Sequence, residues 1–243
     1  MSREFEVARE IELPAGPREV WTAITAEPAA WMFPTGMEIP AGTTPPRGAP
    51  VATWDPPHHL VIRMEAPDGS LNVLEYVIEA RAGGTAHLRY VHSGILADGW
   101  EDQYDAIGAH TDFYLHTLGE YLRHFQGRAV TYVGQPSSGI DGPASANGAD
   151  AMDTLRGALG LTAGAQPGDP VHATLGEAGA LDGVVDYATP EFLGVRTEDG
   201  LYRFFGRNHF GHVVGMSAHV FVDGVDAAAR ADALKAWLDG LYD

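Results

Sequence analysis

A strict alternation of apolar and acidic side chains opens the chain and sets the pattern for its first half. In residues 4–13, one parity carries Phe5, Val7, Ile11 and Leu13, and the other carries Glu4, Glu6, Glu10 and Glu12. This period of two is typical of a strand with one buried face. A short helix follows from Pro17, with its apolar side chains at helical spacing: Val20, Trp21 and Ile24.

More strand-like runs come next, and one long amphipathic helix closes the first half at about 101–126. We expect the strands at 49–55, 59–65, 71–81 and 84–93, with a further short strand at Met37–Ile39 inside a Pro- and Gly-rich loop. One stripe of the long helix is apolar or aromatic and should face the sheet: Ile107, His110, Tyr114, Thr117, Leu118, Tyr121 and Phe125. Its other side includes Asp112, Glu120 and Arg123. The class is therefore α+β, with a curved antiparallel sheet around a long helix that leaves room for a pocket.

The second half repeats the order strand, helix, strands, helix in shorter form. We expect a strand at 129–133, a Gly/Pro/Ser-rich loop at 135–149, a helix at 149–159 and a last helix at 225–241. The strands between these helices are expected near 169–175, 181–188, 191–198, 201–206 and 213–223. The apolar face of the last helix is expected to hold Ala229, Ala233, Leu234, Trp237 and Leu241. This pattern favours a structural repeat, and the alternative is one larger sheet with an extended edge.

Charge and composition narrow the classes of function. The formal charge is -18, and each half contributes -9: residues 1–128 hold 9 Arg against 18 acids, and residues 129–243 hold 6 basic residues against 15 acids. Such a surface repels phosphate backbones, so we expect no nucleic-acid partner. The absence of cysteine excludes disulfides and Cys-based metal sites. No signal peptide and no membrane-spanning run are recognised, so we expect a cytoplasmic protein.

Several segments of the first half appear in an order found in a known superfamily. They are Arg9–Thr25 with Pro14-Ala-Gly-Pro-Arg-Glu-Val-Trp21, Asp55-Pro-Pro57 before Leu60-Val-Ile62, Gly83-Gly-Thr85 and Val91-His-Ser-Gly94. Over about 1–127 the chain resembles the START/Bet v 1-like (SRPBCC) superfamily, in its bacterial branch similar to the activator of heat-shock protein 90 ATPase. The resemblance implies a helix-grip domain at 1–128. Element order alone extends it to a second, shorter helix-grip-like domain at 129–243, read as a degenerate copy.

Members of that superfamily include lipid and hormone carriers, polyketide cyclases and chaperone activators, and no catalytic residues are shared across this branch. Candidate cavity residues therefore come from the pattern itself. We expect the long helix to contribute Ile107, His110 and Tyr114, and the concave strand faces to contribute Tyr76, Tyr90 and His92. Trp31, Phe33 and Met37 lie in the loop after the short helix and would form an aromatic lip. One alternative is that the histidines and tyrosines among these are core or rim residues whose polar tips bond to backbone or water. Another is that the lip packs against the second half.

No catalytic motif accompanies these residues, and His209-Phe-Gly-His212 lacks the further ligands of a metal site, so we predict neither metal nor cofactor. The leading hypothesis is the binding of a small hydrophobic or aromatic molecule. A second hypothesis is a polyketide cyclase or dehydrase, with His110 or His92 as base and a tyrosine as donor. A third is a chaperone partner. A homodimer is left open, and the second half is a lid, a dimer surface or a decayed copy.

Overall fold

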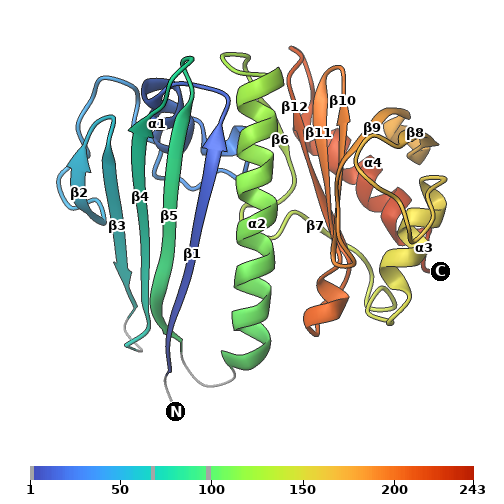
Figure 1. The fold of residues 1–243 in the computed structure, drawn as a ribbon. Helices are drawn as coiled ribbons and strands as arrows, with labels where there is room; N and C mark the ends of the chain where they lie inside the picture. The colour runs from blue at the N-terminus through green and yellow to red at the C-terminus, as the bar shows by residue number, and fades with distance from the viewer. Residues whose placement is uncertain (1–2, 67–68, 97–99) are drawn as a thin grey trace. The chain divides into compact units, whose positions relative to one another are not determined.

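Two separate antiparallel sheets hold the strands of the protein in the computed structural model, which describes residues 3–66, 69–96 and 100–243 (Figure 1). One sheet belongs to a unit that ends at Gln126, and the other to a unit that begins at Gly127. Both units are α+β and helix-grip in their element order. The alternative of one larger sheet is therefore wrong.

The sheet of unit 1 has the order β1-β5-β4-β3-β2, so the first strand pairs with the last and the others form a meander. Its elements are β1 (Arg3–Leu13), α1 (Pro17–Thr25), the 3-10 turn η1 (Pro28–Ala30), β2 (Val51–Asp55), β3 (His59–Glu65), β4 (Leu71–Ala80), β5 (Ala86–Leu96) and α2 (Trp100–His124). The strands and both helices thus confirm the order expected from the sequence.

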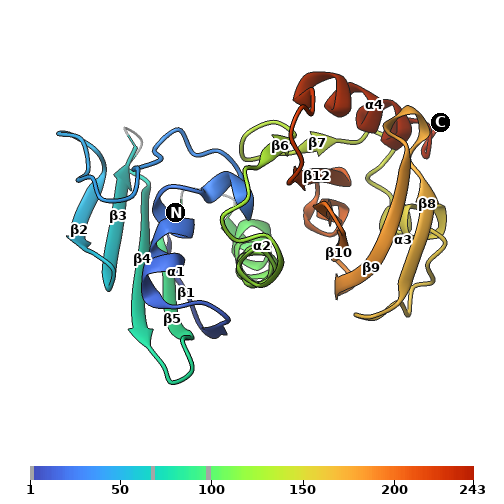
Figure 2. The ribbon, with the colours of Figure 1, turned by 90° about the horizontal axis from the view of Figure 1, so that it is seen from above.

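Both helices of unit 1 pack on its sheet, α1 against β4 and α2 against β1. Figure 2 shows α1 and α2 next to each other beside the sheet. Leu118 and Tyr121 of α2 and Phe125 directly after it are buried, as the apolar stripe predicts. An ion pair also ties α2 to β1, since Arg9 Nη2 donates to Asp112 Oδ2 at 3.0 Å. The core of unit 1 therefore lies between the sheet and these two helices.

The sheet of unit 2 has the order β6-β12-β11-β10-β9-β8, and β7 also pairs with β12. Its elements are β6 (Thr131–Val133), β7 (Ile140–Asp141), α3 (Ala151–Ala158), β8 (Pro170–Thr174), η2 (Gly176–Ala178), β9 (Ala180–Ala188), β10 (Phe192–Thr197), β11 (Gly200–Phe205), η3 (Arg207–Phe210), β12 (Gly215–Val220) and α4 (Ala227–Asp239). The first strand again pairs with the last, so the order of unit 1 recurs.

One face of the second sheet carries a continuous apolar core with α3 and α4. Leu155 of α3 and Leu234 of α4 are fully buried there, together with Tyr202 and Phe204 of β11 and Met216 of β12. An ion pair is also buried in unit 2, because Arg203 Nη1 lies 2.9 Å from Asp186 Oδ2 and both side chains are almost inaccessible. The second unit thus builds its core independently of the first.

Four details differ from the sequence-based expectations. Met37–Ile39 is irregular and not a strand. The loop expected at 135–149 contains β7. On α4, Leu238 is buried while Ala229 is exposed. Glu120, expected on the outer side of α2, is buried and accepts from Arg123 Nη1 at 2.8 Å. The last two differ because helical spacing predicts a face to within about one residue only.

Candidate ligand-binding site

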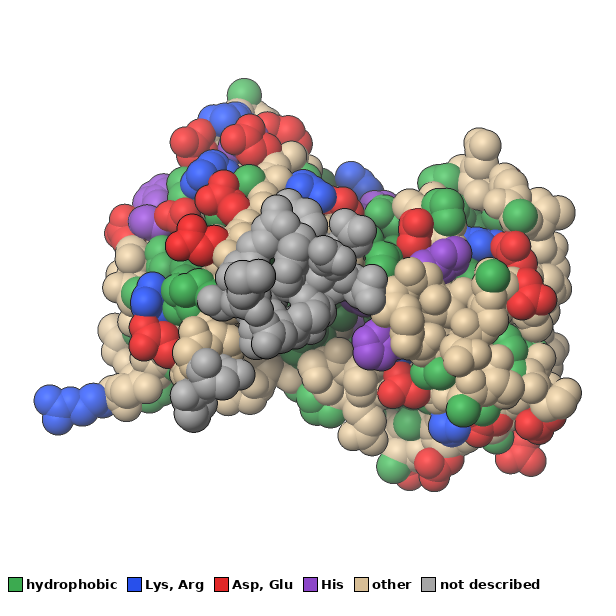
Figure 3. Space-filling model, turned by 90° about the horizontal axis from the view of Figure 1, so that it is seen from below, with side chains coloured by type: hydrophobic (Ala, Val, Ile, Leu, Met, Phe, Trp, Pro, Cys, Tyr) green, Lys and Arg blue, Asp and Glu red, His purple; other side chains and the backbone are tan. Residues whose placement is uncertain are grey.

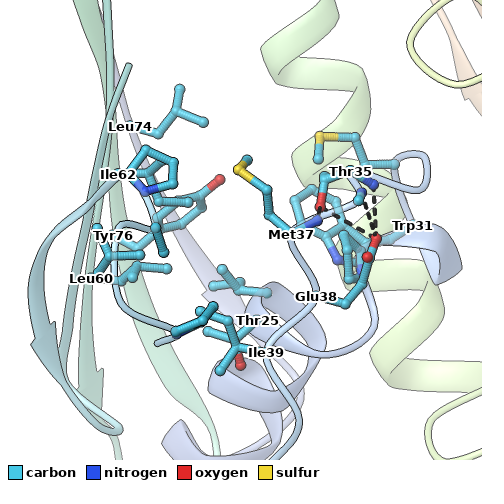
Figure 4. A pocket seen from close by; sticks show the side chains of 18 residues that line it. Thr25, Trp31, Thr35, Met37, Glu38, Ile39, Leu60, Ile62, Leu74 and Tyr76 are labelled. Carbon is cyan, nitrogen blue, oxygen red and sulfur yellow. Dashed lines mark hydrogen bonds between the residues drawn. The ribbon is translucent and has the colours of Figure 1, made fainter. Parts of the chain in front are cut away.

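Unit 1 contains a cavity of about 270 Å³ beside the end of α1 (Figure 4). Its walls come from three places: α1 with η1, the loop at 31–50, and strands β2 to β4. The lining residues are Ile24, Thr25, Pro28, Trp31, Met32, Thr35, Gly36, Met37, Glu38, Ile39, Pro46, Ala49, Pro50, Val51, Leu60, Ile62, Leu74 and Tyr76. Most of these side chains are apolar, so a molecule in the cavity would contact mainly carbon atoms.

The strand wall follows from the alternation of side chains. Leu60 and Ile62 point to the same face of β3, and they pair with Tyr76 and Leu74 of β4 respectively. Val51 of β2 extends this patch, since it pairs with Ile62. Alternate residues of β3 and β4, together with Val51 of β2, therefore form one apolar wall.

The loop wall is held to α1 by two hydrogen bonds. Ile39 N donates at 2.7 Å to the carbonyl oxygen of Thr25, the last residue of α1. Trp31 Nε1 donates to Ala23 O at 2.9 Å, and Trp31 is only 2% exposed. The loop therefore keeps its place beside the sheet although it has no regular secondary structure.

A tight turn at the cavity rim fixes the one charged lining residue. Glu38 Oε1 accepts from Thr35 N at 2.8 Å and from Gly36 N at 3.2 Å (Figure 4). Burial acts to raise the pKa of Glu38, but the backbone hydrogen bonds prevail and the pKa lies below its usual value. The carboxylate is thus ionised at neutral pH and engaged with its own loop.

Tyr76 supplies the polar group inside the cavity. Its hydroxyl points into the space between the strands and the loop (Figure 4). The residue is 4% exposed, and burial raises the pKa of its hydroxyl well above the usual value. At neutral pH this group is therefore protonated and able to donate a hydrogen bond.

Three of the nine residues expected from the sequence line this cavity: Trp31, Met37 and Tyr76. Met37 is 39% exposed and lies at the mouth, whereas Trp31 and Tyr76 are buried. The other six lie elsewhere in unit 1.

Tyr90 and His92 lie on the same sheet face as Tyr76 and continue from it in a row of tilted ring contacts outside the cavity. The ring centroids of Tyr76 and Tyr90 are 5.0 Å apart, and those of Tyr90 and His92 are 6.4 Å apart. His92 Nε2 lies 2.7 Å from Asn72 Oδ1, which can only accept. Burial lowers the pKa of His92 to about 4. This side chain is therefore neutral at physiological pH.

Phe33, His110 and Tyr114 form a third group, between the loop and α2. The rings of Phe33 and Tyr114 meet edge to face with centroids 5.9 Å apart, and His110 and Tyr114 lie 6.2 Å apart. His110 Nδ1 lies 2.8 Å from Ala106 O, one turn earlier on the helix. Ile107 is half-buried on α2 and belongs to neither group. None of these residues lines the cavity.

The remaining lining residues were missed by the reasoning from sequence. A usable signal existed for Leu60, Ile62 and Leu74, because they share the parity that places Tyr76 on the concave face. The loop residues carried no such signal, because an irregular segment has no periodicity from which a face can be deduced.

Few side chains around this cavity are suited to acid–base catalysis or to metal binding. No histidine is among the described residues that line it. In the described parts of the chain, no three His, Asp or Glu side chains gather in a way that could hold a metal ion. The arrangement suits the burial of an apolar molecule with one polar contact.

No protein-family model matches the sequence, and no curated protein matches it either. Among solved structures, DynU16, a protein in the dynemicin biosynthetic locus, is similar at 15% identity and a TM-score of 0.39, over 98% of this chain and 95% of that chain. An uncharacterized protein from Rhizobium leguminosarum is similar at 17% identity and a TM-score of 0.39, over 51% of this chain and 97% of that chain.

An AHSA1-like protein from Rhizobium etli is 25% identical with a TM-score of 0.33, over 52% of this chain and 84% of that chain. The fold class rests on the strand order of the two sheets themselves.

Among the residues the structure describes, no helix has the length and apolar character needed to cross a membrane.

Proposed function

We propose that unit 1 binds a small hydrophobic or aromatic molecule in the cavity beside α1. The observation that carries this proposal is a cavity of about 270 Å³ with mainly apolar walls. This volume lies just below the range of about 300–1,000 Å³ that is usual for drug-sized ligands. A molecule of one or two rings is the size that suits it.

The hydrogen bonds made by the polar groups of the loop support the proposal. The Trp31 indole N–H and the Ile39 amide bond to α1, and the Glu38 carboxylate bonds to its own turn. These groups therefore need no solvent inside the cavity. Their pairing leaves the walls apolar and suited to exclude water.

The geometry favours binding over catalysis. The cyclase or dehydrase hypothesis requires His110 or His92 as a base, yet neither lines the cavity and both have a hydrogen-bonding neighbour elsewhere. No specific observation favours a chaperone partner or a homodimer. Our proposal includes the membership of residues 1–128 in the START/Bet v 1-like superfamily and a second helix-grip-like domain at 129–243, to which it assigns no activity.

The test compares two tryptophan substitutions on the same strand. Leu74 lines the cavity, whereas Val73 lies on the opposite face of β4. Leu74→Trp should fill the cavity and weaken binding of the neutral two-ring fluorescent probe 2-ethylnaphthalene by about tenfold or more, a loss of about 1.4 kcal/mol. Val73→Trp should leave the affinity unchanged. Equal affinities in both variants would mean that the probe binds elsewhere and would contradict the proposal.

A further inference from the structure

The Tyr76 hydroxyl is an inward-facing polar group in an apolar cavity (Figure 4). Tyr76 is 4% exposed, and its ring meets that of Tyr90 on the next strand at a tilt of 52°. Among the described residues, none forms a hydrogen bond with this hydroxyl, and burial alone accounts for its raised pKa. The hydroxyl is not one of the fully enclosed polar atoms of the described residues, because it meets the space of the cavity. Its hydrogen-bonding partner is therefore to be sought in the contents of the cavity.

The charge of the walls limits what those contents can be. Glu38 is the only charged residue among the described lining residues, and no Arg, Lys or His accompanies it. An anionic group in this cavity would lose its hydration without gaining a cation, and it would face the Glu38 carboxylate. The walls therefore disfavour fatty acids and other carboxylates.

The protonation state of Tyr76 decides the direction of the hydrogen bond. The hydroxyl keeps its proton at neutral pH, so it needs an acceptor if that proton is to be paired. A ligand that only donates to the phenolic oxygen would leave the O–H without a partner. A carbonyl or ether oxygen satisfies it.

We propose that the cavity selects a neutral molecule of one or two rings that carries an acceptor oxygen, and that the Tyr76 hydroxyl donates to this oxygen. Tyr76 is then the residue that determines specificity, while the apolar walls supply most of the affinity. This inference rests on the proposed function, because it requires that the cavity binds a ligand.

The experiment uses three probes with the same ring system and the full-length protein. 2-Acetylnaphthalene offers a carbonyl oxygen, 2-ethylnaphthalene lacks it, and 2-naphthoate carries a negative charge. Calorimetric titration should show that the wild type binds the ketone about 5- to 10-fold more tightly than the hydrocarbon. Tyr76→Phe should abolish this difference without lowering the melting temperature. Tyr90→Phe, the same change on a residue that does not line the cavity, should preserve it.

Each other outcome has a distinct meaning. If the ketone and the hydrocarbon bind equally well to the wild type, the role of Tyr76 is refuted while the proposed function stands. If 2-naphthoate binds more tightly than the ketone, the selection of neutral ligands is refuted. If none of the probes binds, the proposed function itself fails.

Discussion

His92 shows how burial changes the behaviour of a single residue. It lies on the concave face of β5, where Phe5 meets it edge to face at 5.1 Å and Asn72 Oδ1 lies 2.7 Å from its Nε2. Burial lowers its pKa to about 4, whereas a histidine in an unfolded chain titrates near about 6.5. The unfolded state therefore binds more protons between these two values.

Stability should depend on His92 as the pH falls. Because the folded-state pKa is the lower one, the contribution is complete above about pH 6.5 and is lost as the pH falls towards about 4, by about 2–3 kcal/mol. Urea unfolding at pH 7.5 and 4.5 should show that His92→Gln loses less stability than the wild type. His209→Gln, a change at an exposed residue of unit 2, should behave like the wild type. An equal loss in His92→Gln and the wild type would refute a buried, neutral His92.

For single residues, the sequence predicted the sheet face to which a side chain points but not which side chains surround it. Alternation correctly placed Tyr76, Tyr90 and His92 on the same face. It did not reveal that Tyr90 and His92 pack against neighbouring rings while Tyr76 lines an open space. That difference depends on which loop lies over each part of the sheet.

Among the secondary-structure elements, β5 shows how closely neighbouring strands approach. A Cβ on Gly94 would lie 1.9 Å from the carbonyl oxygen of Leu71 and 3.0 Å from the Phe5 ring. The nearest atom belongs to the backbone of β4, which cannot move aside without breaking the pairing. Gly108 on α2 differs, because its added Cβ would find its nearest neighbour, Arg9 Nη2, at 3.7 Å.

The same substitution should therefore have opposite effects on these two elements. Gly94→Ala should lower the free energy of unfolding of unit 1 by about 2–3 kcal/mol, because β5 and β4 must separate locally. Gly108→Ala should raise it by about 0.5–1 kcal/mol through helix propensity. Tryptophan fluorescence during urea unfolding can measure both, since four of the five tryptophans lie in unit 1: Trp21, Trp31, Trp54 and Trp100. A neutral Gly94→Ala would contradict the close approach of the two strands.

The prediction of a strand at Met37–Ile39 was wrong because of the turn residues next to it. The run Met-Glu-Ile alternates, but it lies between Gly36, which has a positive φ of 71°, and Pro40. The Glu38 side chain bonds back to Thr35 and Gly36. Local turn chemistry thus competes successfully with a three-residue pattern.

Across the whole molecule, the charge of -18 is shared by both halves of the chain. On the face that Figure 3 shows, acidic side chains lie in several places rather than in one patch. Several acids of unit 1 pair with neighbours across the sheet, for example Glu12 with His87 at 2.9 Å. Such exposed pairs contribute little stability, so net repulsion should dominate at low ionic strength.

Added salt should therefore raise the stability of the folded protein but leave the affinity for a neutral ligand unchanged. An increase from 0.01 M to 0.15 M shortens the screening length from about 30 Å to about 8 Å. The urea midpoint should rise, because self-repulsion of the folded state is screened. The affinity for the neutral 2-acetylnaphthalene should stay within about twofold, because its binding involves no net charge. A midpoint that falls with salt would mean that attractive ion pairs outweigh the repulsion.

The sequence by itself determined the type and order of nearly all elements and the face to which most strand residues point. These properties depend on periodicity and on turn residues, which are local. The sequence favoured two sheets but left one larger sheet open, and the structure decided between them. Only the tertiary structure decided where the cavity lies. The expected site included the α2 stripe, yet His110 and Tyr114 pack with Phe33, and the open space lies beside α1. Whether a space is filled depends on side chains from segments distant in sequence, and no local pattern encodes that fit.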